Sequence, residues 1–381
     1  MLLPIPTGAA RRALTAIAVS VTVVLTASGC ADFSEQDRNR DAGAFSSVPE
    51  NQGPRQRPSA PSSPEEPQEP PKGPCVDPNP AVIATCLSTT SGVRPADPSG
   101  QTTYVAERTT GQIIISKRYG PQRVIATVPV ESGGDGGLID FELSPGYQQD
   151  RLIFALITTG SDNRVVRIAP DGVVTPVLTG IPKGPTGNMG SISFSSTGIL
   201  RVATGNAGDA GAARDRGSLA GKLLEINTNA DSPRPKILAS GFGASVALCP
   251  DPENGRIYVA DSGPAGDRLQ MLEPSGLRRL WSWADRPGVT GCAVAGGQIA
   301  VSIAKKFRID VLAAPSNASP SVGKPTKQDV KEQFGAVGRM TTFGAAMQLA
   351  TINKSVPGAS VQTDDRVAIY APAGGTADDK R

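Results

Sequence analysis

The side chains that could carry chemistry form a short set in this chain. The 381 residues include no histidine, which removes histidine-based triads, histidine-ligated zinc or haem and the usual proton carrier near neutral pH. Proton transfer would therefore depend on carboxylates. Asp135, Asp140 and Asp209 lie in or beside glycine-rich stretches and could form an acidic mouth together, although carboxylates in such loops usually cap turns.

Cys30 has the surroundings of a lipidated cysteine. Arg11 and Arg12 precede an uncharged apolar run over 13–27, and two small residues then lead to Cys30. This run of about 15 residues is shorter than the roughly 20 that a membrane-spanning helix needs, so cleavage before Cys30 is favoured over a permanent span. Residues 25–30 resemble a bacterial lipobox, in which the cysteine sulfur receives a diacylglyceryl group. A plain secretory signal is the alternative. We expect a palmitate-bearing lipoprotein on the extracytoplasmic face of the cell membrane, since two acyl chains suffice for stable anchoring.

The other four cysteines predict disulfides. Cys75 and Cys86 bracket a short segment where the folded domain begins, so we pair them, which leaves Cys249 with Cys292. An even number of remaining cysteines suits an oxidising compartment. The neighbours of Cys249 and Cys292 have the character of core strands, and buried free thiols are the alternative for this second pair.

Composition divides the chain into four parts. Residues 1–29 are the expected signal peptide, and 30–74 are the lipidated cysteine with a proline-rich disordered tether that cannot bury enough apolar surface to fold. Residues 75–375 are the expected folded domain, and 376–381 a disordered tail. The net charge is +3 and basic residues are scattered, which predicts no nucleic-acid partner.

Short strands dominate the folded domain. They are rich in β-branched residues and bounded by glycine, proline, aspartate or asparagine, as at residues 112–116, 164–168 and 256–260. A turn followed by two strands recurs at Ser144, Ser196 and Pro252, about 50 residues apart, which is the spacing of propeller blades. We predict an all-β, six-bladed β-propeller, with a pair of β-sandwiches as the competing architecture.

Two parts of the domain carry a resemblance to a known family. Residues 135–147 with 162–168, and residues 190–208 with 218–226, resemble the soluble quinoprotein glucose/sorbosone dehydrogenases. With its lipoprotein start, the chain is similar to mycobacterial lipoproteins placed in that family. The resemblance implies a six-bladed propeller with pyrroloquinoline quinone (PQQ) and calcium at the mouth of the central channel. There a sugar passes hydride to the quinone while a histidine takes the hydroxyl proton.

Carried over residue by residue, the family's site is incomplete in this chain. The resemblance places the family's histidine at Gly187, which cannot accept a proton. It places the family's quinone-binding Arg-Asn pair within residues 241–245, where both polar side chains are missing. Gly263 and Pro264 match the calcium loop, and an ordinary turn is the alternative there.

Two cationic residues still match positions of the family's site, and two aspartates could replace its histidine as the base. Lys305 aligns with a lysine that meets the quinone, although a solvated strand end is the alternative, and Arg339 aligns loosely with an arginine of the last blade. Asp135 and Asp209 could act as bases if burial raised their pKa. Two further residues, Trp281 and Trp283, share one face of a strand and are expected to pack between blades, with a ligand platform as the alternative.

The sequence therefore favours a catalytically degenerate binding propeller over an enzyme. Its expected partners, besides the membrane, are a glycan, another envelope component or an exported protein, and PQQ and calcium are implied by resemblance alone. A working PQQ-dependent aldose or sorbosone dehydrogenase with a base other than histidine is the first alternative. A different propeller enzyme, such as a lactonase or phosphoesterase, is the weaker one, because no histidine or tight carboxylate cluster is visible.

Overall fold

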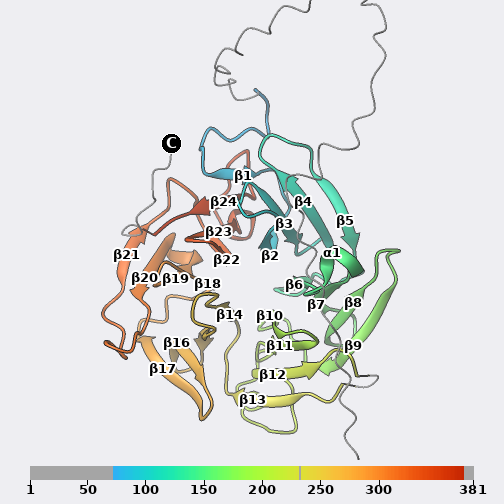
Figure 1. The fold of residues 1–381 in the computed structure, drawn as a ribbon, viewed down its shortest axis with the longest axis vertical. Coiled ribbons are helices and arrows are strands. Elements are labelled where there is room, and N and C mark those ends of the chain that lie inside the picture. Colours follow the sequence, from blue (N-terminus) through green and yellow to red (C-terminus); the bar gives the residue numbers. More distant parts are fainter. Residues whose placement is uncertain (1–71, 231–232, 373–381) are drawn as a thin grey trace, which may run out of the picture. The chain divides into compact units, whose positions relative to one another are not determined.

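The computed structural model describes residues 72–230 and 233–372. The expected signal peptide, Cys30, the tether up to residue 71 and the tail from 376 lie outside the described residues. The described chain forms six four-stranded antiparallel sheets arranged in a ring (Figure 1). This confirms the predicted all-β, six-bladed propeller. No helix in the described ranges is long and apolar enough to cross a membrane.

Five blades are meanders of four consecutive strands. Blade 1 comprises β2 (Thr90–Pro95), β3 (Thr102–Glu107), β4 (Gln112–Lys117) and β5 (Arg123–Thr127). Blade 2 comprises β6 (Leu138–Leu143), β7 (Ile153–Thr158), β8 (Asn163–Ile168) and β9 (Val174–Ile181). Blade 3 comprises β10 (Ser191–Ser196), β11 (Ile199–Ala203), β12 (Lys222–Asn227) and β13 (Lys236–Ser240). Blade 4 comprises β14 (Val246–Pro250), β15 (Ile257–Gly263), β16 (Gly266–Glu273) and β17 (Gly276–Trp283). Blade 5 comprises β18 (Gly291–Ala295), β19 (Gln298–Ile303), β20 (Arg308–Ala313) and β21 (Thr326–Asp329).

The sixth blade closes the ring with a strand from the other end of the domain. It consists of β22 (Val337–Phe343), β23 (Ala346–Thr351), β24 (Val367–Tyr370) and β1 (Val82–Ala84), and β1 pairs antiparallel with β24. Short helices occur only between strands in the described part: α1 (Tyr147–Asp150), η2 (Ala304–Lys306) and η3 (Asn353–Ser355). Closure by β1 makes the last blade depend on the first residues of the domain.

Burial within a blade explains why a middle strand such as β7 is apolar on both faces. Every residue of β7, which reads Ile-Phe-Ala-Leu-Ile-Thr, is buried, because neighbouring blades cover both faces of the sheet. The outer strand β5 is mostly exposed or half-buried. The apolar run of β7 is therefore enclosed between blades, whereas the polar outer strand β5 faces solvent.

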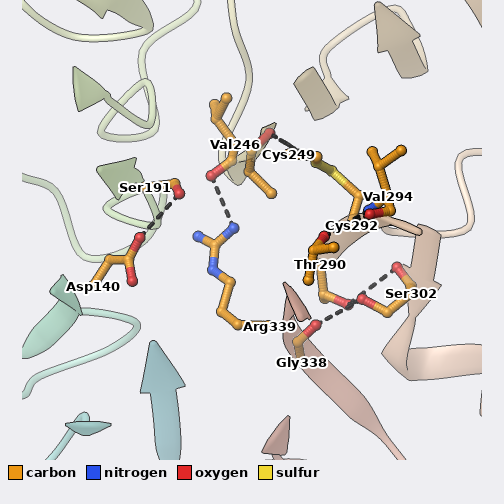
Figure 2. Close-up of a disulfide and its surroundings, with 12 residues drawn as sticks. Asp140, Ser191, Val246, Cys249, Thr290, Cys292, Val294, Ser302, Gly338 and Arg339 are labelled. Carbon is orange, nitrogen blue, oxygen red and sulfur yellow. Dashed lines mark hydrogen bonds between the residues drawn. A yellow bond between two sulfur atoms is a disulfide. The ribbon is translucent and has the colours of Figure 1, made fainter. Parts of the chain in front are cut away.

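Disulfides hold the propeller at two places. Cys75 and Cys86 are bonded near β1, and Cys249 of β14 is bonded to Cys292 of β18, with 5.6 Å between the Cα atoms in each pair. The second disulfide joins the inner strands of blades 4 and 5 (Figure 2). Both predicted pairs are confirmed, and the alternative of free thiols for Cys249 and Cys292 is wrong.

Trp283 also packs between blades 4 and 5. Its ring is buried in a core cluster that draws on both blades, and its indole N–H donates a hydrogen bond to Asp310 Oδ2 at 2.8 Å. Trp281 packs against the same cluster. The predicted inter-blade packing of the two tryptophans is confirmed.

Asp365 is a fully buried carboxyl just before β24, the strand that pairs with β1. Its Oδ1 accepts hydrogen bonds from the Asn353 N–H at 2.6 Å and the Thr351 hydroxyl at 3.2 Å, whereas Oδ2 has no partner among the described residues. Burial raises the pKa of Asp365 to about 7, and the adjacent Asp364 carboxylate acts in the same direction.

The raised pKa of Asp365 predicts that stability falls as pH rises. The folded chain holds a proton that the unfolded chain loses near its ordinary pKa of 3.8, so this contribution is full below about pH 4 and is lost through pH 7. At about 1.4 kcal/mol per pKa unit, the loss of stability is up to about 4 kcal/mol.

Urea unfolding at pH 5 and pH 7.5 measures this loss of stability. Asp365→Asn should remove this slope, whereas Asp162→Asn, at a carboxyl whose pKa is lowered, should leave it. An unchanged slope in Asp365→Asn would contradict the assignment.

Candidate functional site

Two cavities occupy the central channel, one at each end of the inner strands. The upper cavity, about 460 Å³, lies where the inner strands begin and is lined by Thr90, Asp135, Ser245, Thr290, Lys305 and Arg339 among others. The lower cavity, about 330 Å³, lies where they end and is lined by residues that include Arg94, Glu142, Ser193, Pro250, Arg339 and Thr341. Residues at or close to the start of each inner strand (β2, β6, β10, β14, β18 and β22) thus line the upper cavity, because every blade presents this strand to the axis.

Arg339 of β22 stands between the two cavities and lines both. Its guanidinium crosses from blade 6 to the backbone of blades 3 and 4. It donates to the carbonyl of Val246 at 2.9 Å (Figure 2) and to that of Gly190 at 2.5 Å. The side chain is buried, and Nε has no hydrogen-bond partner among the described residues. Burial lowers the pKa of Arg339, against the attraction of Asp140. A buried cation held only by carbonyl groups therefore divides the channel.

The backbone around Gly187 leaves no room for a side chain. Gly187 has a φ of +83°, and a Cβ placed there would lie 2.6 Å from the backbone nitrogen of Gly208 and 2.7 Å from Asn206 Oδ1. Its carbonyl accepts a hydrogen bond from the Ala207 N–H at 2.8 Å. The position where the resemblance puts a histidine is therefore closed by the loop that follows β11.

Asp135 holds the loop that contains Gly187. Its Oδ2 accepts from the Gly187 N–H at 2.7 Å, and its Oδ1 accepts from the backbone N–H and the side-chain amide of Asn188 at 3.2 and 2.6 Å. Both oxygens are engaged, although the residue lines the upper cavity. In the structure Asp135 therefore positions a loop.

The three aspartates of the sequence analysis do not meet. Asp209 is exposed, and its Oδ1 accepts from the N–H groups of Gly211 at 2.7 Å and Ala212 at 3.1 Å, as a turn cap does. Asp140 lies at the lower cavity, across Arg339 from Asp135. The idea of one acidic mouth built from Asp135, Asp140 and Asp209 is wrong, because their loops and strands end at different places along the channel.

The lower cavity contains an ion cluster that sequence reasoning missed. Arg94 of β2 lies 3.2 Å from Asp140 Oδ1 and 3.0 Å from Glu142 Oε2, both in β6. Asp140 Oδ2 also accepts from the Ser191 hydroxyl and the Ile192 N–H of β10, each at 2.9 Å. The cluster thus ties the inner strands of blades 1, 2 and 3. Burial raises the pKa of Glu142, although Arg94 opposes this. The feature of the sequence that could have indicated this cluster was an ionisable residue inside an otherwise apolar inner strand.

Gly263 and Pro264 form a hairpin turn. Gly263 pairs with Gly266, so Pro264 is one of the two residues that connect β15 to β16. Asp261, which precedes them, forms an ion pair with Arg268 and accepts from the Gly243 N–H at 2.7 Å. Within the described ranges, no three cysteine or carboxylate side chains are grouped so that they could hold a metal ion.

Lys305 lies in η2 and lines the upper cavity with its exposed side chain. Its ammonium makes no hydrogen bond or ion pair with any residue that the structure describes. Of the site residues predicted from the sequence, Asp135, Lys305 and Arg339 are brought together in the upper cavity, whereas Asp209, Gly263 and Pro264 are not among the residues that line it.

Lys222 lies in residues 218–226, one of the segments that carry the family resemblance, and has a structural role here. Lys222 is fully buried, and its Nζ donates to the carbonyls of Ala212, Ala213 and Ala220 at 3.0, 2.8 and 2.7 Å. Burial lowers its pKa, against the attraction of Asp215. The lysine therefore secures the long loop between β11 and β12 and does not face a ligand.

The upper cavity does not fit the quinone and calcium that the resemblance implies. The base position is sealed at Gly187, residues 241–245 offer neither arginine nor asparagine, and the matched calcium loop is a hairpin turn with its aspartate paired to arginine. Lys305 and Arg339 are the remaining matches, and the second is directed at backbone carbonyls.

Fold and channel together define a six-bladed β-propeller with a ligand-sized cavity where its inner strands begin. Residues 96–277 match the family model described as glucose/sorbosone dehydrogenase. This match confirms the resemblance to that family predicted from the sequence.

The chain is also similar to one curated protein and to solved structures. Aldose sugar dehydrogenase YliI of Escherichia coli (strain K12) is 25% identical over 175 residues, which are 40% of this chain and 47% of that protein, so the match spans about half of this relative. The PQQ-bound form of aldose sugar dehydrogenase (Adh) from Streptomyces coelicolor superposes with a TM-score of 0.66 at 25% identity, covering 76% of this chain and 96% of that one. The apo form of the soluble aldose sugar dehydrogenase (Asd) from Escherichia coli has a TM-score of 0.60 at 16% identity, covering 76% and 98%, and shares the fold.

Proposed function

We propose that this protein is an exported, lipid-anchored binding propeller that has lost the sugar oxidation of its relatives. The observation that carries the proposal is the closed backbone at Gly187, where a Cβ would lie 2.6 Å from another backbone atom. Loss of a general base typically slows such a reaction by about 10²–10⁴-fold, and here the neighbouring loop occupies the space that a base would need.

The other acid–base candidates support the same conclusion. Asp135 would have to give up three N–H donors before it could serve as a base. Asp209 caps an exposed turn. Because both carboxylates stabilise loops, neither is free to move toward a substrate in the upper cavity.

Export and anchoring are part of the proposal. Two disulfides at buried or closing positions suit an oxidising compartment, and Cys30 supplies the site for a lipid on the extracytoplasmic face of the membrane. From there the upper cavity would take a glycan, another envelope component or part of an exported protein.

A PQQ-dependent aldose or sorbosone dehydrogenase with a base other than histidine is the second candidate. It is favoured by the relatives, which are aldose sugar dehydrogenases, and by the position of Asp135 on the cavity wall. It requires that Asp135 exchange its loop contacts for a substrate hydroxyl.

Thermal unfolding and dye reduction separate the two candidates. The full chain in detergent is heated alone and with calcium chloride plus PQQ, and is then assayed for dye reduction with glucose. We expect no rise in melting temperature, because a ligand that does not bind the folded state cannot stabilise it, and no turnover. A clear rise with glucose-dependent reduction that is lost in Asp135→Asn would overturn the proposal.

A further inference from the structure

We propose that the upper cavity binds an acidic saccharide, that is, a sugar bearing a carboxylate or phosphate group. This inference rests on the proposed binding function and names its ligand class. It starts from charge: three cationic side chains, Arg108, Lys305 and Arg339, line the cavity, and Asp135 is the single carboxylate among the lining residues.

None of the three cations has a carboxylate partner among the described residues. Arg108 Nη1 donates to the carbonyls of Gly136 at 2.5 Å and Gly134 at 3.3 Å. Arg339 donates to two carbonyls and has an unpartnered Nε, although only 5% of the residue is exposed. A desolvated cation such as Arg339 is costly when no carboxylate lies within ion-pair distance, and a bound anion would supply such a partner through strong, charge-assisted hydrogen bonds.

The rest of the lining suits a sugar. Eight serine and threonine residues line the cavity, and among them the hydroxyls of Thr186 and Ser245 make no hydrogen bond to another described residue. Met189, Val289 and Ile352 add apolar surface on which the C–H face of a sugar ring could lie. The cavity volume of about 460 Å³ falls within the usual range for small-molecule sites of about 300–1,000 Å³.

The combination discriminates between ligand chemistries. A neutral sugar would leave the excess positive charge of the cavity lining unpaired. A small inorganic anion would leave the hydroxyls of Thr186 and Ser245 without a hydrogen-bond partner. A sugar with one acidic group satisfies both parts of the lining.

Calorimetric titration of the full chain in detergent tests the inference with three probes: glucuronate, glucose 6-phosphate and glucose. We expect at least one acidic sugar to bind about tenfold or more tightly than glucose, with an affinity that falls as salt is raised. Preference for glucuronate would identify a carboxylate ligand, and preference for glucose 6-phosphate a phosphorylated one. Either preference supports the proposal.

Lys305→Gln should weaken binding of the preferred acidic sugar about tenfold, because it removes one charged contact worth about one factor of ten. Lys306→Gln is the matched control, since this exposed neighbour is not among the residues that line the cavity. Both variants should keep the melting temperature of the parent protein.

Three results would overturn the inference: equal affinity for glucose and the acidic sugars, equal weakening by Lys305→Gln and Lys306→Gln, or no binding of any probe. None of these binding results would show that the protein is a dehydrogenase. The dye-reduction assay therefore still decides the proposed function separately.

Discussion

Asp140→Ala is expected to lower the free energy of unfolding by about 3–5 kcal/mol, the usual cost of removing one partner of a buried ion pair. The loss leaves Arg94 without its most buried partner and deprives the Ser191 hydroxyl and the Ile192 N–H of their acceptor. Since these groups belong to the inner strands of three blades, the damage is at the centre of the propeller. Urea unfolding followed by tryptophan fluorescence measures the change.

Glu142→Gln provides the matched control for Asp140→Ala. Glu142 contacts the same arginine at 3.0 Å, but 20% of its side chain is exposed, compared with 3% for Asp140. Water screens a more exposed pair, so we expect a cost of about 1 kcal/mol or less. Equal costs for the two variants would show that Asp140 does not hold the blades together in the way proposed. An Arg94→Met/Asp140→Ala double variant should be less destabilised than the sum of the single changes.

Gly187→His is expected to destabilise the protein by about 3 kcal/mol or more without producing sugar oxidation. The substitution combines two costs: a left-handed backbone conformation that disfavours side chains, about 1–2 kcal/mol, and contact of Cβ with the backbone of Gly208 and with Asn206. Relief of that contact requires the loop after β11 to move. Thermal unfolding and the dye-reduction assay with PQQ, calcium and glucose measure both outcomes.

Gly241→Ala separates the two costs at Gly187. Gly241 has nearly the same φ, +86°, but a Cβ there would meet nothing within 4 Å. We expect Gly241→Ala to cost about 1 kcal/mol and Gly187→Ala clearly more, the difference being steric. Should Gly187→His fold like the parent protein and oxidise glucose, the base position would be open and the proposed binding function would be wrong.

Several features of the fold could be predicted from local pattern. Residues 112–116 and 164–168 have the β-branched composition and bounding turns of strands, and they lie in β4 and β8. The disulfide pairs followed from the position of Cys75 and Cys86 at the start of the domain. The family resemblance identified Lys305 and Arg339, which share one cavity although they belong to different blades.

Other features could not be predicted, because they depend on distant segments. Arg94 and Asp140 are 46 residues apart, and their pairing depends on the register of two neighbouring blades. Gly187 is sealed by residues 206–208 of another loop, a contact that no spacing in the sequence reveals. The same holds for Asp135, whose type suggested a base and whose surroundings make it the anchor of the Gly187 loop.

By itself, the sequence determined which chemistry is absent and which architecture is built. The lack of histidine and the glycine at position 187 are properties of composition, and the recurring turn-and-strand unit specifies blades through local backbone preferences. The tertiary structure alone decided which charges meet: it set Arg94 against Asp140, and placed Arg108, Lys305 and Arg339 around one cavity with Asp135 as the single carboxylate of its lining. The physical reason is that strand propensity acts over a few residues, whereas pairing and burial of charge depend on how separate blades come together around the channel.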